Sequence, residues 1–237
     1  MSPSTDRSEN REFATELKFL VTPQRAGEIQ AWAEARLDAD PHGGLDGRYL
    51  VTSLYFDTEA RDVYARNGSF GRSKYRIRRY GAGEVIFVER KMKRDGRVGK
   101  TRSVVAEAEL ARLTQVPSKD WAGYWFHRRL QARCLEPVCQ ISYRRMARAV
   151  MSEQGPIRMT IDADVRAVAC HDMSFRVEMG REVLNRQIVE IKFRGEMPAM
   201  FQEMCRRFLL TPQAVSKYRM AAAALGLAPK RSLCQAS

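Results

Sequence analysis

The sequence has no long apolar run that could cross a membrane. The longest candidate, Met220–Ala228, is short and rich in alanine and glycine, whereas a membrane helix needs roughly 18 apolar residues. The first ten residues, MSPSTDRSEN, are polar and lack the apolar stretch of a signal peptide. These absences predict a soluble protein, although a basic surface could still touch a membrane.

Cysteine and histidine are scarce and scattered. The five cysteines form no CxxC pair, and the three histidines do not stand at ligand spacing from them, which argues against a zinc site. An odd number of unpaired thiols suits a reducing compartment, so we expect a cytoplasmic protein.

Acidic residues are outnumbered, with 28 Asp and Glu against 41 Lys and Arg and a net charge of +13. This excess predicts a polyanionic partner: nucleic acid, polyphosphate, a phosphorylated small molecule or an anionic membrane surface. Apolar residues make up 44% of the chain, enough for a sizeable core. No linker or repeat interrupts it, so we expect one domain over residues 11–228, with a disordered tail at 1–10 and a C-terminal tail at 229–237.

Alternation of apolar and polar residues predicts eight strands. They are Thr15–Val21, Tyr49–Asp57, Lys74–Tyr80, Glu84–Met92, Val98–Val105, Val138–Met146, Ile157–Val165 and Gln187–Arg194. Thr22 and Pro23 predict a helix start, with Thr22 as N-cap. Residues 107–133 are expected to form two helices separated at Pro117, the second capped by Ser118. Further helices are expected near 59–66, over 198–209 and from about Ser216.

The polar faces of these strands carry mostly Lys and Arg. Lys74, Arg76 and Arg78 share one face of their strand, and Lys100 and Arg102 share another. A solvated outer face would explain any single strand. Repetition over at least six strands favours another interpretation, because like charges opposed on a sheet repel by up to about 1 kcal/mol per pair. A bound polyanion would remove that repulsion.

The amphipathic helices also need an apolar surface to cover. Apolar strand faces turned outward would receive them, which leaves the charged faces pointing inward. The sequence therefore predicts an α+β fold: a closed antiparallel β-tunnel of about eight strands with surrounding helices and a lumen lined by Lys and Arg.

Seven short motifs occur in order over about residues 12–225, and together they resemble the VTC domain. They are ExK (Glu16, Lys18), KYRIRRY (Lys74–Tyr80), ERK…GKTR (Glu89–Arg102), SYRRMAR (Ser142–Arg148), RMTID (Arg158–Asp162), VEIKF (Val189–Phe193) and SKY (Ser216–Tyr218). The VTC domain is the polyphosphate polymerase domain of the triphosphate tunnel, or CYTH-like, superfamily. The resemblance implies an antiparallel β-tunnel and transfer of the γ-phosphate of a nucleoside triphosphate, such as ATP, to polyphosphate.

The resemblance also implies roles for individual residues. The residues expected to bind the reacting phosphates are Arg76, Arg78, Lys91, Arg145 and Arg158. Those expected to line the tunnel and bind phosphate are Lys18, Lys74, Lys100, Arg102, Lys192, Lys217, Ser216 and Tyr143. Glu190, with Glu16 and Glu89, is expected to hold Mn²⁺ or Mg²⁺. Arg145 is preferred to Arg144 because it alternates with Tyr143, although a bulge could reverse that choice.

These residue types suit phosphoryl transfer, which depends mainly on positioning and charge stabilisation. Arg makes planar bidentate contacts to phosphate, and Mg²⁺ or Mn²⁺ needs only one or two carboxylates plus phosphate oxygens. Hydrolytic members of the superfamily often begin with ExExK, but Ala14 stands at the first position here. The excess of cations over carboxylates favours holding a long polyanion over two-metal hydrolysis.

Three functions remain open: a polyphosphate polymerase, a non-catalytic sensor of polyphosphate or another phosphate ligand, and a tripolyphosphatase or nucleoside triphosphatase. Nucleic acid is not expected, because the basic residues face inward. Tyr75, Phe87 and Phe193 are interpreted as core residues facing helices, not as stacking platforms for bases. The oligomeric state and a partner in the membrane are left open.

Overall fold

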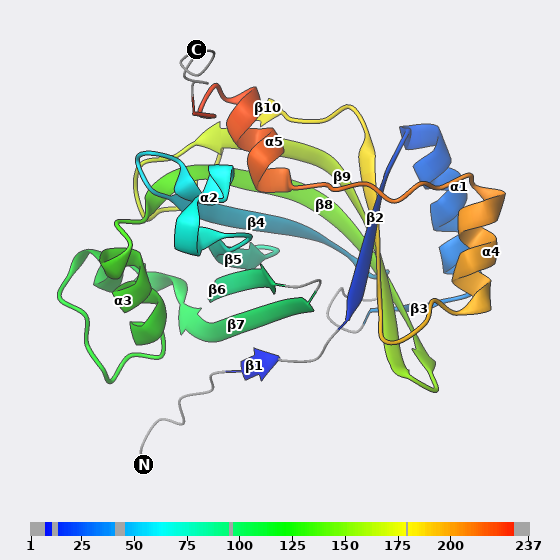
Figure 1. Ribbon diagram of the computed structural model, residues 1–237, viewed down its shortest axis with the longest axis horizontal. Helices are drawn as coiled ribbons and strands as arrows, with labels where there is room; N and C mark the ends of the chain where they lie inside the picture. Colours follow the sequence, from blue (N-terminus) through cyan, green and yellow to red (C-terminus); the bar gives the residue numbers. More distant parts are fainter. Residues whose placement is uncertain (1–7, 11–13, 41–45, 95–96, 179, 230–237) are drawn as a thin grey trace, which may run out of the picture.

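One strongly curved antiparallel sheet forms the body of the protein (Figure 1). The computed structural model describes residues 8–10, 14–40, 46–94, 97–178 and 180–229. In these ranges the strand order is β1-β7-β6-β5-β4-β8-β9-β11-β2, with β3 beside β8 and β10 beside β9. The strands are β1 (Ser8–Asn10), β2 (Thr15–Val21), β3 (Asp38–Ala39), β4 (Arg48–Asp57), β5 (Lys74–Tyr80), β6 (Val85–Arg94), β7 (Arg97–Ala106), β8 (Glu136–Ser152), β9 (Gly155–Ala169), β10 (Arg181–Glu182) and β11 (Gln187–Phe193).

All eight predicted strands are present. β2 and β5 have the predicted bounds, whereas β8 and β9 extend well beyond them because they pair along their length up to Ser152 and Gly155. The predicted turn at Asp95-Gly96 lies outside the described residues.

The helices lie around the sheet. They are α1 (Pro23–Glu34), α2 (Asp62–Ala65), α3 (Tyr124–Ala132), α4 (Ala199–Arg207) and α5 (Lys217–Ala224), with 3₁₀ helices η2 (Gly68–Phe70) and η3 (Glu107–Thr114). The predicted start of α1 is confirmed, since the Thr22 hydroxyl accepts a hydrogen bond from the backbone N–H of Arg25 at 3.3 Å. No helix in the described ranges is both long enough and apolar enough to cross a bilayer.

The prediction that Ser118 caps the second helix of residues 107–133 is wrong. The Ser118 hydroxyl pairs with Asp120 instead, and α3 begins only at Tyr124. The ring of Trp121 covers Gly123, where a Cβ atom would lie 2.5 Å from the indole. This packing needs a glycine at the position directly before the helix.

Two apolar clusters lie on the outer side of the sheet, under the helices. Under α1 and α4, the apolar faces of β2, β9 and β11 meet residues such as Ile29, Trp32 and Phe201. Around η3 and α3, the outward residues of β4 to β7 pack with residues such as Leu110 and Phe126. α1, α4, η3 and α3 therefore cover the apolar strand faces, and the charged faces point into the concave side.

The sheet is not closed by strand pairing, which corrects the prediction of a closed tunnel. The free edge of β2 is occupied instead: the backbone N–H of Gln213, in the segment between α4 and α5, donates to the carbonyl of Lys18 at 2.7 Å. β2 is joined to β6 by side chains, because the Lys91 ammonium donates to both carboxylate oxygens of Glu16 at 2.9 and 2.7 Å.

The predicted N-terminal tail is also partly corrected. Ser8–Asn10 pairs with β7, because β7 offers an edge with free backbone groups. β1 and β2 lie at opposite ends of the strand order, yet five peptide steps from Asn10 to Thr15 span at most about 18 Å. The sheet must therefore curl until its two margins lie close together. Residues 1–7 and 230–237 of the predicted tails lie outside the described residues.

Candidate functional site

The concave face of the sheet carries the predicted cations, and their contacts cross the enclosed space. Register places Lys74 opposite Lys91 and Arg76 opposite Glu89 on β5 and β6. Contacts such as Lys91 to Glu16 of β2, and Lys217 of α5 to Asp162 of β9, connect elements that are not neighbours in the sheet. The charged faces therefore enclose one lumen.

Glu89 is the centre of the first charged cluster. Its side chain is fully buried, and it accepts from Arg76 Nε at 2.7 Å and Lys100 Nζ at 2.6 Å, with Arg102 Nε at 3.7 Å. Burial alone would raise the pKa of Glu89, but the charges of Arg76 and Arg78 bring it well below its usual range. Glu89 thus remains ionised and fixes the cations around it.

Asp162 is the centre of the second cluster. Arg145 donates to it in bidentate fashion at 2.6 and 2.8 Å, and Lys217 donates from the other side at 2.5 Å. Burial opposes ionisation, but these two cations lower the pKa of Asp162 to about 2. The Lys217 ammonium also lies 4.6 Å from the ring centre of buried Tyr143.

Arg145 faces the lumen, and its neighbour Arg144 does not. The Arg144 side chain is 75% exposed. The register between β8 and β9 does shift between Ser142 and Arg144, but Asp164 of β9 adopts a left-handed φ of 53° there. The irregularity in β9 leaves the alternation of Tyr143 and Arg145 intact.

A third cluster joins β2 and β11. Lys18 Nζ lies 3.5 Å from Glu16 and 3.2 Å from Glu190. Burial opposes ionisation of Glu190, but Lys18 and a hydrogen bond with Glu16 bring the pKa of Glu190 well below its usual range. Two carboxyl groups and two lysines, Lys18 and Lys91, thus meet at the seam of the sheet.

Lys74 has a different environment from the other lysines. Within the described part of the chain no carboxylate contacts its ammonium. Its pKa is lowered to about 7, first by burial and then by Lys18 and Lys91, against the opposing effect of Tyr55. Burial would raise the pKa of Tyr55, but Arg76 and Arg78 lower it to about 7; the Tyr55 hydroxyl also contacts Arg76 at 3.1 Å.

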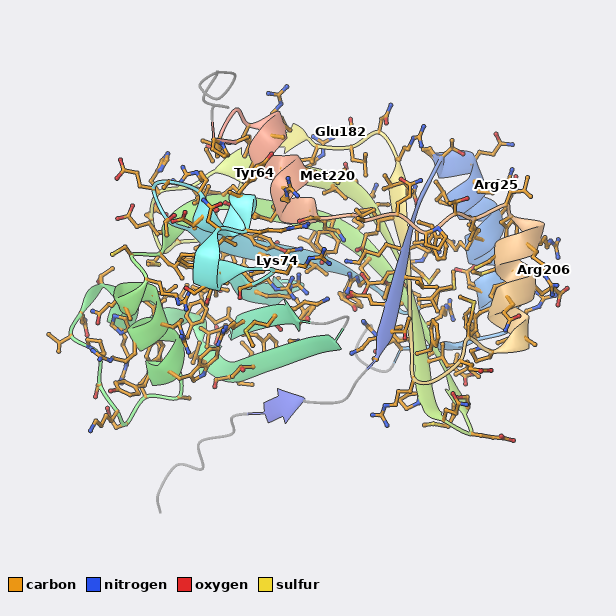
Figure 2. All side chains as sticks on the ribbon, in the orientation of Figure 1. Arg25, Tyr64, Lys74, Glu182, Arg206 and Met220 are labelled. Atoms are coloured by element: carbon orange, nitrogen blue, oxygen red, sulfur yellow. The ribbon has the colours of Figure 1, made fainter. Side chains whose placement is uncertain are left out.

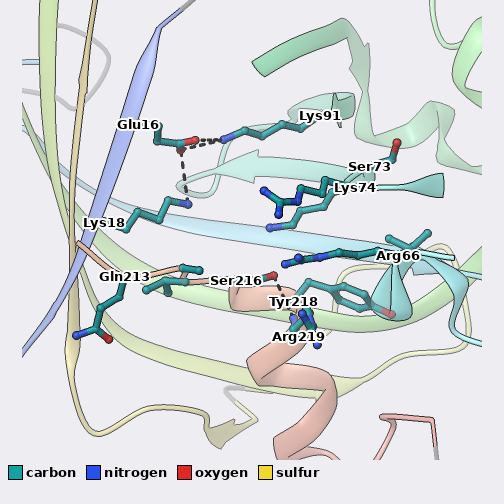
Figure 3. A pocket seen from close by; sticks show the side chains of 14 residues that line it. Glu16, Lys18, Arg66, Ser73, Lys74, Lys91, Gln213, Ser216, Tyr218 and Arg219 are labelled. Carbon is teal, nitrogen blue, oxygen red and sulfur yellow. Dashed lines mark hydrogen bonds and ion pairs between the residues drawn. The ribbon is translucent and has the colours of Figure 1, made fainter. Parts of the chain in front are cut away.

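A pocket of about 170 Å³ lies beside Lys74, at one end of the lumen, which we call the mouth (Figure 3). Lys18, Lys74 and Lys91 line it together with Arg66, Arg72 and Arg219, which sequence reasoning missed. These arginines follow α2, precede β5 and lie in α5, so no strand alternation marks them. Their shared position depends on the tertiary fold.

The remaining predicted residues occupy other parts of the lumen. Arg78 Nε donates to buried Ser53 at 2.9 Å. Arg158 contacts Asp40 and donates to the Tyr49 hydroxyl at 2.7 Å.

Ser216 and Lys192 lie at its margins. Ser216 lines the mouth pocket and caps α5 by accepting from the Arg219 N–H at 3.4 Å. Lys192 shares the face of Glu190, but its side chain is exposed.

The interpretation of Phe87 as a core residue under a helix is wrong. Phe87 is paired with Arg78 and Val104 and shares the lumen face of Glu89. The Arg102 guanidinium lies 3.3 Å from its ring centre. The alternation Phe87, Glu89, Lys91 already placed it on that face.

The predicted metal-binding carboxylates fall into two groups. Glu16 and Glu190 lie together around Lys18, whereas Glu89 is enclosed by cations. No set of three or more His, Cys, Asp or Glu residues suited to a metal occurs in the described ranges. Glu16 and Glu190 still fit Mg²⁺ or Mn²⁺, since such ions take one or two carboxylates and complete their shell with phosphate oxygens and water.

Three solved structures of low sequence identity are similar to this chain, and the first of them shares its fold. A "putative adenylate cyclase" from Bacillus halodurans is 18% identical, with a TM-score of 0.55 over 86% of this chain and 94% of that one. The PH1819 protein from Pyrococcus horikoshii is 12% identical, with a TM-score of 0.49 over 90% and 99%. A "putative adenylyl cyclase" from Hippeastrum, described as having a dominant triphosphatase activity, is 12% identical, with a TM-score of 0.48 over 90% and 97%.

Sequence comparison gives the family. Among curated proteins there is no match. The family model of the VTC domain matches residues 13–226, which includes every strand from β2 to β11 and every helix. The chain therefore belongs to the VTC domain family.

Proposed function

We propose that this protein is a metal-dependent polyphosphate polymerase that moves the γ-phosphate of a nucleoside triphosphate, ATP in the first instance, onto a polyphosphate chain in the lumen. One observation carries the proposal: cations from many separate elements surround a single space, with far fewer carboxylates among them. The cations are Lys18, Lys74, Arg76, Arg78, Lys91, Lys100, Arg102, Arg145, Arg158, Lys192 and Lys217. A line of cations fits a linear polyanion better than a compact one.

The proposed reaction needs no protein nucleophile. A terminal oxygen of the acceptor chain attacks the γ-phosphorus, a new P–O–P bond forms, and the bond to the β-phosphate breaks to release a nucleoside diphosphate. Charge on the transferred group is then the main barrier, and preorganised guanidinium groups stabilise it. Arg76 and Arg145 are held by buried carboxylates, so little reorganisation accompanies the reaction.

Glu16 and Glu190 would hold the divalent cation, which when bound supplies charge neutralisation for the transferred phosphoryl group. Glu89 has a different role in this proposal. Its carboxylate is taken up by Arg76 and Lys100, so it positions these cations and does not bind metal. Ala14, in place of a further acidic residue, supports transfer over two-metal hydrolysis.

The test is to incubate the purified protein with ATP, Mn²⁺ and a short polyphosphate primer, and to follow chain length, nucleoside diphosphate and free phosphate together. We expect longer chains and one diphosphate released per phosphate added. Free phosphate without chain growth would indicate a triphosphatase. Tight polyphosphate binding without either product, with Mg²⁺ as well as Mn²⁺, would indicate a binding module.

A further inference from the structure

The mouth pocket contains cations that the described residues leave without a carboxylate partner. Deeper in the lumen, Arg76, Arg145 and Lys217 each contact a buried carboxylate. Among the mouth residues, Lys18 and Lys91 share Glu16, which is the single carboxylate in the pocket lining. Arg66, Arg72 and Arg219 add three exposed guanidinium groups beyond it.

Two of these arginines are presented by helices with a common anchor. Arg66 directly follows α2, and Arg219 lies in the first turn of α5. Buried Asp57 accepts hydrogen bonds from the α2 backbone at Val63, at 2.8 Å, and from the Tyr218 hydroxyl of α5, at 2.5 Å. The backbone positions from which the two arginines extend are therefore held by a buried contact.

The backbone and the local charge also distinguish Arg66. It adopts a left-handed φ of 65°, which a non-glycine residue rarely adopts. Its pKa is lowered by burial and by the nearby charges of Arg219 and Arg72. The guanidinium group of Arg66 is thus close enough to those of Arg219 and Arg72 to be repelled by them, and an anion bound beside it would relieve this repulsion.

The pocket suits a phosphate chain better than a nucleoside. A base needs an open aromatic face for stacking, but the aromatic residue in the lining, Tyr218, is 1% exposed. The nearby Tyr64 ring is covered by the Arg219 guanidinium at 5.0 Å. What the mouth offers is charge: Lys74 lies beside Arg66, Lys18 and Lys91 lie near Glu16, and Arg219 adds a further guanidinium group (Figure 3).

We infer that Arg66, Arg72 and Arg219 form an outer subsite that binds the part of a polyphosphate chain projecting from the lumen, and thereby favours long chains over tripolyphosphate. This inference rests on the proposed function. Exposed arginines bind a linear polyanion largely by releasing its counterions, so the subsite contributes an affinity that falls steeply with salt.

The experiment compares two triple variants of the full chain with equal loss of charge. R66A/R72A/R219A removes the subsite, and K119A/R128A/R206A removes three exposed cations elsewhere; Arg206, for example, lies on the outer side of α4 (Figure 2). The probes are tripolyphosphate and a long polyphosphate of defined length. Dissociation constants are measured by calorimetry at several NaCl concentrations, after thermal melts show that both variants fold.

We expect the subsite variant to bind the long chain about tenfold more weakly and tripolyphosphate nearly as tightly as the wild type. The slope of log K against log[NaCl] for the long chain should become shallower by about 2, as three fewer phosphates are neutralised. The control variant should change neither quantity by as much. Equal losses for both probes, or equal losses in both variants, would each overturn the inference. If the wild type binds neither phosphate probe, the proposed function itself fails.

Discussion

Glu89 and Glu190 are both buried carboxylates among cations, but their neighbours differ. Glu89 is surrounded by cations, since Arg76 contacts one of its oxygens and Lys100 the other. Glu190 has Lys18 on one side and the carboxyl group of Glu16 on the other. Two acidic groups close together favour a bound cation, and this difference supports the proposal that Glu190, and not Glu89, binds the metal.

Replacing Glu190 by Gln keeps size and hydrogen bonding but removes the anion that a hard cation needs. We expect Glu190→Gln to lose metal-dependent turnover by orders of magnitude while binding tripolyphosphate at least as tightly as the wild type. Arg78→Ala should weaken binding and turnover together. Steady-state assays with Mn²⁺ and calorimetry with tripolyphosphate separate the two effects. Wild-type polymerisation by Glu190→Gln would show that the metal assignment is wrong.

Lys74 should make phosphate binding depend on pH. Its pKa in the folded, ligand-free protein is about 7, against 10.5 for a free lysine. The unfolded chain therefore holds more protons between these two values, so the stability of the ligand-free protein rises with pH in that window. A phosphate ligand needs the protonated ammonium, so affinity should fall by up to about tenfold per pH unit above 7.

The matched variant is Lys74→Arg, because a guanidinium stays charged throughout this range. Protonation of the ligand itself affects the variant and the wild type equally, so it cancels in the comparison. We expect it to flatten the dependence of the tripolyphosphate dissociation constant on pH while keeping the affinity measured at low pH. Parallel pH profiles for the two proteins would rule out Lys74 as the titrating group.

At the scale of elements, α5 is held on the concave side of the sheet by polar contacts with two buried carboxylates. The Tyr218 hydroxyl donates to Asp57 Oδ2 at 2.5 Å, and its ring stacks on Tyr55 at 5.4 Å. The same helix presents Lys217 to Asp162. The placement of α5 thus determines the placement of a lumen cation.

Tyr218→Phe removes only the hydroxyl. Because a buried hydrogen bond to a charged acceptor contributes about 1.5–3 kcal/mol, we expect the melting temperature to drop by about 3–10 °C for a chain of this size. Tyr124→Phe on α3 is the control and should change it little. Scanning calorimetry checks both variants, and an unchanged melting temperature in Tyr218→Phe would mean that Asp57 does not anchor α5.

The strands were predictable from the sequence because apolar and polar side chains alternate along each strand, according to which face of the sheet they occupy. Lys74, Arg76 and Arg78 share a face in the sequence and in the structure. The start of α3 and the open seam were not predictable in this way. The first depends on Trp121 packing over Gly123, and the second on Gln213 occupying the edge of β2; both contacts are set by the folded structure.

The residues of the candidate site also fall into a group that the sequence predicts and a group that it does not. Lumen residues on strands, such as Arg145 and Arg158, could be found by alternation and resemblance. Arg66, Arg72 and Arg219 could not, since they come from a helix end, a loop and a short helix. Only the fold brings them to one pocket.

At the scale of the whole molecule, the chain has a net charge of +13. Many of its Lys and Arg side chains lie together in the lumen, where they repel one another. A ligand that binds only the native state stabilises it by about 2.7 kcal/mol at a hundredfold excess over its dissociation constant. Tripolyphosphate at that excess should therefore raise the melting temperature by about 5–10 °C. The shift should shrink in high salt. Absence of any shift at low salt would contradict every phosphate-binding function considered above.

The join between β2 and β6 has a topological consequence. In the described residues no continuous ladder of backbone hydrogen bonds encircles the lumen; the Lys91–Glu16 ion pair connects β2, at one margin of the sheet, to β6, which lies two strands in from the other margin. The sheet is thus strongly curled but is not closed into a barrel. In a closed barrel, the lumen could widen only if backbone hydrogen bonds between strands were broken. Here the contact between β2 and β6 can open when one pair of side chains separates.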